Sequence, residues 1–234
     1  MASNTLIQFF EGEYIMCSYE NYPKLGSGSR YYKKLDEYVT KSGLTFDFTK
    51  ELTISEFEEI LGENTTLVAE CVFNSKENSN GSRRVTINGE NFEGNLVRYD
   101  GLHESWKDSS AEWIYCITYN DHIVKIGMTI TSLKDRYKSY ACGYRKTMKT
   151  GTPSTTNFVV NETNYAALLC GVKVEIHAIR LDKVKSEVTR FGVTKEINMS
   201  VARDYEEMVT DLFVEYSGHI PVLCVQKGDS ISTK

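Results

Sequence analysis

The sequence predicts a mixed α+β protein, and three observations indicate this class. Hydrophobic residues make up 41% and charged residues 25% of the 234 positions, which are ordinary values for a globular protein. Two pairs of residues that favour tight turns, Asn88-Gly89 and Asn120-Asp121, each separate two apolar segments, as in β-hairpins. Ser-x-x-Glu and Ser-x-x-Asp capping patterns precede segments whose apolar residues recur at helical spacing.

Residues 1–108 are expected to form a small α/β region. A flexible turn, LGSGS, precedes a helix that we expect over Arg30–Lys41. A second helix is expected to begin at a capping box formed by Ser55 and Glu58. Gly62 is placed to end that helix.

Strands are expected to follow these helices. The segment Thr65–Phe73 (TTLVAECVF) is rich in β-branched and apolar residues, which favour a strand. Arg83–Ile87 and Phe92–Tyr99 flank Asn88-Gly89 and are expected to pair as a hairpin.

A polar stretch, Gly101–Ser110 (GLHESWKDSS), separates the two halves of the chain. We therefore divide the chain into an N-terminal α/β region, 1–108, and a second domain, 109–234. The second domain begins with two apolar segments, Trp113–Tyr119 and His122–Met128, which we expect to form an antiparallel hairpin.

A short helix with a clear start follows this hairpin. Ser132 and Asp135 form a capping pair for it. Further along, Val172–Leu181 is expected to be a third strand and Val201–Tyr216 a helix. Pro221 begins a final segment, PVLCVQ, which we expect to be extended.

The charge pattern argues against general attraction to nucleic acid but marks one local basic cluster. The formal net charge is −5, so an average surface would repel phosphate. Around the capped helix, six basic residues accompany the single acid Asp135, with tyrosines between them: Lys134, Arg136, Lys138, Arg145, Lys146 and Lys149. This cluster suits a DNA backbone, although a solvated helix face and loop would have the same composition.

The second domain resembles the GIY-YIG nuclease family over roughly Glu112–Gln226. Trp113-Ile114-Tyr115 is similar to the first family motif, with Trp in place of Gly, and Lys125-Ile126-Gly127 is similar to the second, with Lys in place of Tyr. The phrase KIGMTITSLKDRYKSY is close to many family members. The resemblance implies a three-stranded antiparallel sheet flanked by helices.

The resemblance also implies a set of catalytic residues. Some restriction endonucleases of the family combine a tyrosine, a lysine, an arginine, a metal-binding glutamate and a late glutamine. The positions here that match this set are Tyr115, Lys125, Arg136, Glu206 and Gln226. Gln226 enters because the family's usual late asparagine is replaced by Cys224, whose thiol cannot replace an amide.

We prefer Glu206 to the neighbouring Glu207 because the catalytic carboxylate should face the sheet. Val209 and Phe213 lie three and seven positions after Glu206, which places all three on one helix face. Glu206 is expected to bind one Mg²⁺ (or Mn²⁺), with water completing the coordination.

The residue types fit phosphodiester hydrolysis, which needs an activated water and neutralisation of charge on phosphorus. Tyr115 is expected to relay a proton from the water, and Lys125, if neutral, to accept the proton of Tyr115. Arg136 is expected to offer its planar set of N–H donors to the scissile phosphate. Each of these residues would be an ordinary strand or surface residue if it stood alone.

The sequence thus predicts a Mg²⁺-dependent DNA endonuclease, of the restriction type, that makes double-strand cuts as a homodimer on DNA. The N-terminal region is the candidate for target recognition, with Arg83 and Arg84 on its hairpin as DNA contacts or plain surface residues. No secretory signal or membrane-spanning segment is evident, so we expect a cytoplasmic protein. A phage or mobile-element nuclease and a non-catalytic nucleic-acid-binding protein remain as alternatives.

Overall fold

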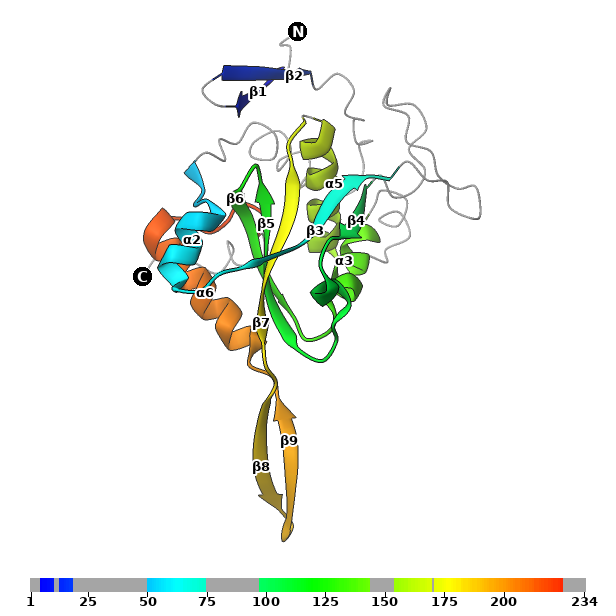
Figure 1. Ribbon diagram of the computed structural model, residues 1–234, viewed down its shortest axis with the longest axis vertical. Coiled ribbons are helices and arrows are strands. Elements are labelled where there is room, and N and C mark those ends of the chain that lie inside the picture. The colour runs from blue at the N-terminus through cyan, green and yellow to red at the C-terminus, as the bar shows by residue number, and fades with distance from the viewer. Residues whose placement is uncertain are drawn as a thin grey trace, which may run out of the picture.

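A five-stranded antiparallel sheet forms the centre of the molecule. The computed structural model describes residues 5–10, 13–18, 50–74, 97–143, 154–169 and 171–224. The strands of the sheet lie in the order β4-β3-β7-β5-β6 (Figure 1). Their bounds are Thr66–Phe73 for β3, Val97–Gly101 for β4, Glu112–Tyr119 for β5, His122–Thr129 for β6 and Val174–Leu181 for β7.

The expectation of a three-stranded sheet is wrong. The three expected strands are β5, β6 and β7, and the structure adds β3 and β4 on the free edge of β7. An uncovered edge of β7 would leave a row of backbone donors and acceptors without partners, and pairing with β3 satisfies them. Both added strands come from residues before 108, so one sheet continues across the position at which we divided the chain.

A separate hairpin lies near the N-terminus. It consists of β1 (Thr5–Phe10) and β2 (Glu13–Ser18), which pair antiparallel only with each other. The sequence analysis did not anticipate it. The helix expected over Arg30–Lys41 and the strand expected over Arg83–Ile87, with Arg84, lie outside the described residues.

Two helices begin at side-chain caps, one of them displaced from its expected position. α2 (Ile54–Leu61) is capped by Thr53 with Glu56, so the box expected at Ser55 and Glu58 is wrong. Gly62 ends α2 in the left-handed conformation, φ 65°, as expected. α3 (Leu133–Ala141) begins as expected, because the hydroxyl of Ser132 accepts a hydrogen bond from the Asp135 backbone N–H at 3.1 Å.

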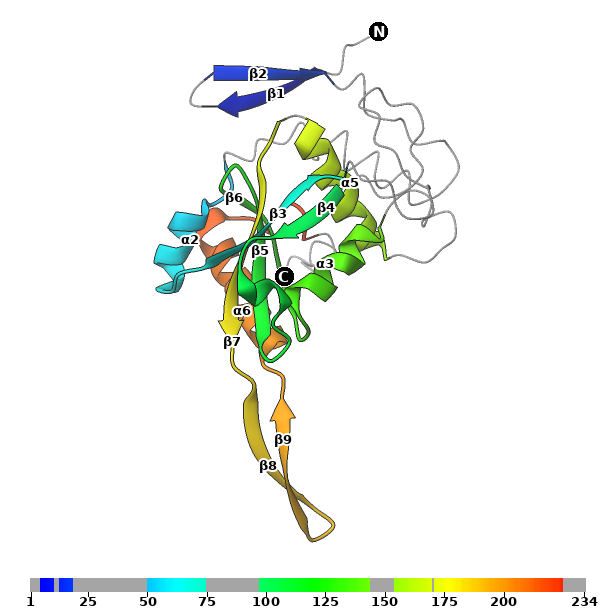
Figure 2. The same cartoon turned by 45° about the vertical axis from the view of Figure 1, so that its right-hand side comes forward.

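Helices cover both faces of the sheet (Figures 1 and 2). On one face, α3 and α5 (Thr155–Leu169) pack on Trp113, Tyr115 and Ile117 of β5. On the other, α2 and α6 (Ala202–Ser217) pack on Ile114 and Cys116. Successive residues of β5 point to opposite faces, so this buried strand contributes to two cores and reads as a continuous apolar run. A short helix, η4 (Glu104–Lys107), precedes β5.

The start of α6 is held by a carboxylate from the sheet. The residue at its N-cap position, Val201, has no side chain that can cap the helix. Glu112 of β5 is buried, and one of its oxygens accepts hydrogen bonds from the backbone N–H groups of Val201 and Ala202, both at 3.0 Å, and from the Ser200 hydroxyl at 3.1 Å. A negative charge at this end of a helix also interacts favourably with the helix dipole. Glu112 therefore fixes α6, the helix that carries Glu206, to β5.

A two-stranded arm projects from the body between β7 and α6 (Figures 1 and 2). It consists of β8 (Val184–Arg190) and β9 (Val193–Met199), which pair with each other and not with the main sheet. The sequence analysis did not anticipate this arm.

None of the described helices is both long enough and apolar enough to cross a lipid bilayer.

Candidate active site

Tyr115, the tyrosine of the first motif, lies at the centre of β5 with its side chain toward α3. Its cross-strand neighbours are Gly127 of β6 and Ala178 of β7, the two smallest residue types. A β-carbon added at Gly127 would lie 2.5 Å from the phenolic oxygen of Tyr115. The glycine of the second motif is therefore required because the tyrosine of the first lies directly over it.

The phenol of Tyr115 belongs to a cluster with Arg136 and Tyr140, both on α3. The hydroxyl groups of Tyr115 and Tyr140 are 2.6 Å apart and share a hydrogen bond. Arg136 donates from Nε to Tyr115 at 3.0 Å and from Nη2 to Tyr140 at 2.9 Å. Two of the five N–H donors of the guanidinium are used in this way. In the part of the chain that is described, its other donors make no hydrogen bond and can meet an oxyanion.

Tyr140 is a site residue that the sequence analysis did not identify. Its place could have been found from spacing, because residues four apart on a helix lie on the same face. Arg136 and Tyr140 have this separation, and the guanidinium carbon of Arg136 lies 4.4 Å from the centre of the Tyr140 ring.

Burial dominates the electrostatics of the cluster. It raises the pKa of the Tyr115 phenol well above its usual value, and Tyr140 adds to this, while the charges of Arg136 and Lys125 act in the opposite direction. Burial alone would lower the pKa of Arg136, but the two phenolic oxygens outweigh it and raise the pKa. The resting site therefore holds a neutral Tyr115 beside a charged guanidinium.

Lys125 lies on the same side of the sheet as Tyr115. The regular pairing of β5 with β6 places Lys125 opposite Ile117, two residues before Gly127, and the β-bulge comes only after this pair. Its side chain is buried, and its ammonium donates to the backbone carbonyl of Leu223 at 3.4 Å. The structure thus brings Tyr115, Lys125 and Arg136 together, as expected, although Lys125 makes no direct hydrogen bond to Tyr115.

The segment after α6 runs beside β6. The Leu223 N–H donates to the Val124 carbonyl at 2.8 Å, and the Cys224 thiol bonds to both backbone groups of Ile126, at 3.4 and 3.3 Å. Residues 221–224 form a turn, so the expected strand from Pro221 is wrong over these residues. Gln226 lies outside the described residues, and its role remains an expectation.

Glu206 lies apart from the Tyr115 cluster. It is half-buried on α6, whereas Glu207 is exposed. However, α6 packs on the face of the sheet opposite to α3, through Val209 and Phe213. Within the described residues, the Glu206 carboxylate makes no hydrogen bond or ion pair.

The described residues contain no cluster of three or more His, Cys, Asp or Glu side chains suited to a metal ion. Mg²⁺ does not need such a cluster, because it usually takes one or two carboxylates and keeps several waters. The carboxylate of Glu206, which has no partner among the described residues, fits that requirement as a single protein ligand.

A second carboxylate, missed by the sequence analysis, lies on the Tyr115 side of the sheet. Glu162 is in α5, the helix that packs against α3, and only 2% of its surface is exposed. Val160 and Tyr165, which lie near Glu162 along the same helix, belong to the same core as Tyr115 and Tyr140.

The expected DNA-binding residues are only partly described. Lys134 and Lys138 are exposed on the outer face of α3, one turn apart and beside Arg136. Arg145, Lys146 and Lys149, like Arg83 and Arg84, lie outside the described residues.

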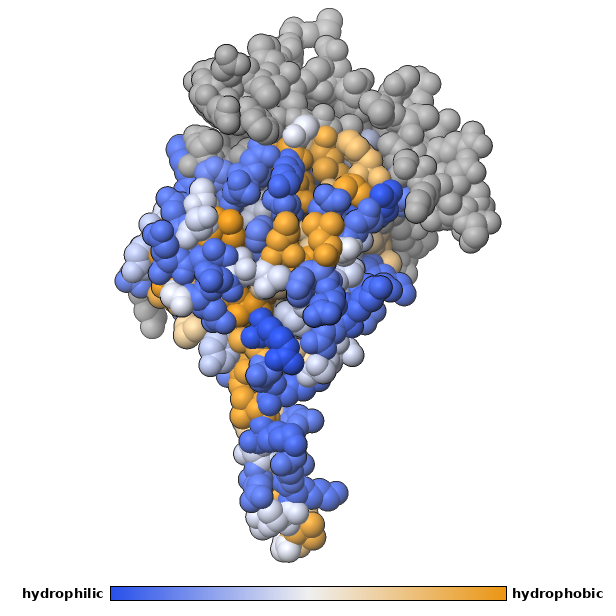
Figure 3. All heavy atoms as spheres, in the orientation of Figure 1, coloured by the Kyte–Doolittle hydropathy of each residue, from blue (hydrophilic) through white to orange (hydrophobic). Residues whose placement is uncertain are grey.

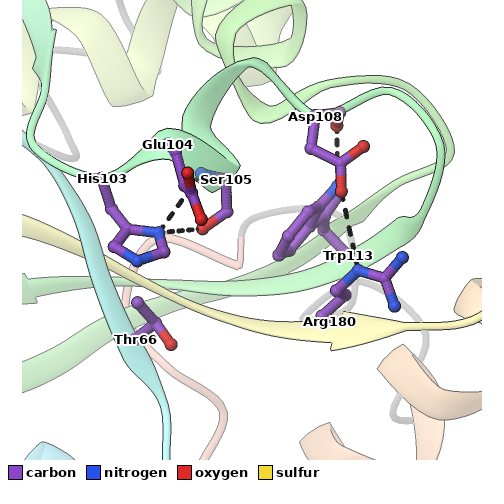
Figure 4. Close-up of a pocket in the computed structure, with 7 residues that line it drawn as sticks. All are labelled: Thr66, His103, Glu104, Ser105, Asp108, Trp113 and Arg180. Carbon is purple, nitrogen blue, oxygen red and sulfur yellow. Dashed lines mark hydrogen bonds and ion pairs between the residues drawn. The ribbon is translucent and has the colours of Figure 1, made fainter.

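The Trp that replaces the glycine of the first motif supports a neighbouring loop. Trp113 is buried, and its indole N–H donates to the backbone carbonyl of Asp108 at 3.2 Å. Beside it lies a pocket of about 460 Å³, whose lining includes His103, Asp108 and Arg180 (Figure 4). None of the expected catalytic residues lines this pocket.

No protein-family model and no curated protein sequence matches the chain. Among solved structures, the chain is similar to restriction endonuclease HPY188I in complex with product DNA, with a TM-score of 0.44 and 23% identity over 77% of this chain and 90% of that one. It is also similar to a mutant of bacteriophage T4 EndoII, with a TM-score of 0.38 and 20% identity over 70% of this chain and 95% of that one. Both likenesses are distant, and the function is therefore inferred from the chain's own residues.

Proposed function

We propose that the chain is a DNA endonuclease of the GIY-YIG type that hydrolyses phosphodiester bonds. The observation that carries this proposal is the cluster of Tyr115, Arg136 and Tyr140, with Lys125 buried on the same side of the sheet. It places a phenol that can transfer a proton beside a guanidinium that can bind phosphate, both of which hydrolysis of a phosphodiester requires.

Arg136 has two roles in this arrangement. Its two bonds to phenols fix the plane of the guanidinium, so its remaining donors are oriented before DNA binds. Its charge also favours the ionised form of Tyr115, against the effect of burial. A phosphate that gains negative charge in the transition state would be held more strongly than the substrate.

Tyr115 cannot act as a strong base in its resting state, because burial keeps the phenol neutral. Proton transfer through Tyr115 therefore needs a second group that takes up the phenolic proton. The candidates for this role are Tyr140, which shares a hydrogen bond with Tyr115, and Lys125, which is buried on the same side of the sheet. Lys125 is the better candidate once neutral, because an amine is more basic than a phenol.

The proposal includes Mg²⁺ as the metal, with Glu206 as its protein ligand. When bound, the metal would neutralise charge on the phosphate and promote ionisation of a water. Glu162 is the second candidate ligand, since it is the buried carboxylate on the helix next to α3. We also propose that two copies act together on DNA, because a site of this kind cuts one strand at a time.

A digest of varied DNAs with and without Mg²⁺ tests the activity and maps the cut positions. Glu206→Gln should abolish cleavage while leaving DNA binding unchanged or tighter, because it removes one negative charge. Glu207→Gln is the matched control and should cut like the wild type. Loss of cleavage in Glu162→Gln, with full activity in Glu206→Gln, would move the metal to the Tyr115 face.

The second candidate function is non-catalytic binding of nucleic acid. The observation that favours it is the 1% exposure of Tyr115, together with the position of Glu206 on the opposite face of the sheet. A protein that binds duplex DNA but cuts none of the tested sequences at any Mg²⁺ or Mn²⁺ concentration would support this candidate.

A further inference from the structure

The arm formed by β8 and β9 is held to the body of the molecule at its base. Isolated two-stranded hairpins are at best marginally stable in water. This one is fixed at its base on both strands: Lys183 donates to the Ser109 carbonyl at 3.3 Å before β8, and Ser200 donates to Glu112 at 3.1 Å after β9. The arm is thus anchored to the body at the point where α6 begins.

The two faces of the arm differ in chemistry. The strand register places one set of side chains on an apolar face: Val184, Ser186, Val188, Arg190, Val193, Lys195, Ile197 and Met199. The other set forms a polar face: Lys185, Glu187, Thr189, Thr194, Glu196 and Asn198. Four residues of the apolar face are each more than 40% exposed: Val184, Val193, Ile197 and Met199.

The tip of the arm carries an exposed aromatic residue in a strained conformation. Phe191 and Gly192 form the turn, with φ values of 55° and 74°, a geometry in which Asn-Gly is the usual pair. A bulky residue with positive φ is an outlier. Phe191 has a relative exposure of 102%, so the described protein gains no packing from it, and Figure 3 shows hydrophobic surface on one side of the arm's end. A strained residue that adds no packing to the fold points to a functional role, here for Phe191.

We propose that the arm lies in a groove of duplex DNA with its apolar face inward, and that Phe191 inserts between adjacent base pairs. The inference rests on the proposed function, since it takes DNA as the partner. Strands of seven residues, at roughly 3.3 Å each, reach along several base pairs, and a two-stranded ribbon fits the major groove. Apolar wedges are a known means of opening a base step.

The distribution of charge on the arm favours duplex DNA as its partner. Arg190 and Lys195 are the only charged residues on the apolar face, while both acids of the arm, Glu187 and Glu196, are on the polar face. The apolar face therefore carries positive charge alone, within a chain whose formal charge is −5. A groove flanked by phosphates is complementary to such a face.

A second copy of the chain fits this face less well. In a twofold pairing, the same face would meet itself, so Arg190 and Lys195 would oppose like charges. A stable protein interface also uses roughly 20–30 residues a side, far more than one face of this arm provides.

Phe191→Asn tests whether Phe191 inserts between base pairs as a wedge. Asn favours this turn, so the thermal unfolding temperature should stay the same or rise. Binding to short labelled duplexes, measured in EDTA by fluorescence anisotropy, should nevertheless weaken about tenfold. The wild type should prefer a duplex with a central mismatch, which is easier to open, and Phe191→Asn should lose this preference. Phe191→Leu should keep part of it. Equal affinities of wild type and Phe191→Asn for both duplexes would overturn the wedge.

Lys195→Gln and Lys185→Gln test the orientation of the arm. Lys195 is on the apolar face, and Lys185 is on the polar face, paired with Glu196 at 2.7 Å. The slope of log affinity against log salt should fall by about one for Lys195→Gln and stay unchanged for Lys185→Gln. The opposite result would show that the polar face meets the DNA.

The outcomes separate this inference from the proposed function. A wild type that binds DNA but does not cut it would refute the nuclease and leave the arm to be judged by the affinities above. A wild type that cuts DNA, with Phe191→Asn equal to it in binding, would refute the arm alone. Sedimentation of the free variants should match the wild type. A change in oligomeric state without a change in DNA affinity would assign the face to a second copy.

Discussion

Gly127→Ala should disable the candidate active site without removing any functional group. The new methyl carbon would lie 2.5 Å from the phenolic oxygen of Tyr115 and 2.6 Å from the ring carbon that bears it. Non-bonded contacts of a β-carbon below 3.0 Å essentially do not occur, so the phenol must move by at least about half an ångström. Such a shift stretches the bonds of Tyr115 to Tyr140 and Arg136, which start at 2.6 and 3.0 Å.

We expect Gly127→Ala to cost about 1–3 kcal/mol of folding free energy, the usual range for overpacking a core. Single-turnover cleavage should fall by roughly 10- to 100-fold, because displacement of a catalytic group by about 1 Å can cost 100-fold. DNA affinity should stay the same, since Arg136 keeps its free donors.

A double-mutant cycle with Tyr115→Ala shows whether the clash is the cause. In that background the methyl group has nothing to meet, so the stability cost of Gly127→Ala should largely vanish. Equal costs in both backgrounds, or wild-type cleavage by Gly127→Ala, would refute the reasoning.

Five further substitutions at four residues test the candidate site and the stability of the fold. Lys125→Met should remove most of the cleavage rate, and Lys125→Arg should not restore it, because a guanidinium cannot accept the proton. Near wild-type rates for the arginine variant at matched stability would show that only the positive charge matters. Tyr140→Phe should lower single-turnover cleavage by about 10- to 100-fold, since a hydrogen bond to a charged group is worth about 1.5–3 kcal/mol; an unchanged rate would make Tyr140 purely structural. Glu112→Ala should cost about 2 kcal/mol in urea unfolding, because buried N–H groups at the start of α6 lose their acceptor. Burial raises the pKa of Glu51 from 4.5 to about 8, so the folded state binds more protons and stability should fall as pH rises through this window. Glu51→Gln should flatten that slope and be more stable than the wild type above pH 8, by a few kcal/mol at most.

Local turn and capping chemistry made parts of the fold predictable. Asn120 and Asp121 adopt φ values of 46° and 70°, which their side chains tolerate, so the hairpin of β5 and β6 could be located from two residues. Ser132 capped α3 for a similar reason. The cap of α2 shows the limit of such reasoning. Thr53 with Glu56 and Ser55 with Glu58 both match the pattern, and local sequence does not discriminate between them.

Other parts depended on information that is not local. The pairing of β3 with β7 joins residues more than a hundred positions apart, and each strand alone shows only apolar character. α5 escaped notice because it buries four consecutive polar residues, Asn161–Asn164, which hide its apolar periodicity. The arm escaped notice because its turn is Phe-Gly instead of Asn-Gly.

The candidate site was predictable where the spacing of residues along the sequence determines which side chains lie close together. Tyr115, Lys125 and Arg136 come together because they lie on two paired strands and the next helix. Glu206 is different, since its distance from Tyr115 depends on which face of the sheet α6 covers. The order of elements along the chain does not settle that choice.

The pairing of β3 with β7 has a consequence for dissecting the protein. A fragment beginning at residue 109 would lack β3 and β4, leaving one edge of β7 bare, and would lack Phe57 of α2, which packs on Phe213. Bare hydrophobic edges invite association between chains. Such a fragment should aggregate when expressed alone, and limited proteolysis should not release a stable core of this length. The catalytic unit of this chain is therefore larger than its sequence motifs suggest.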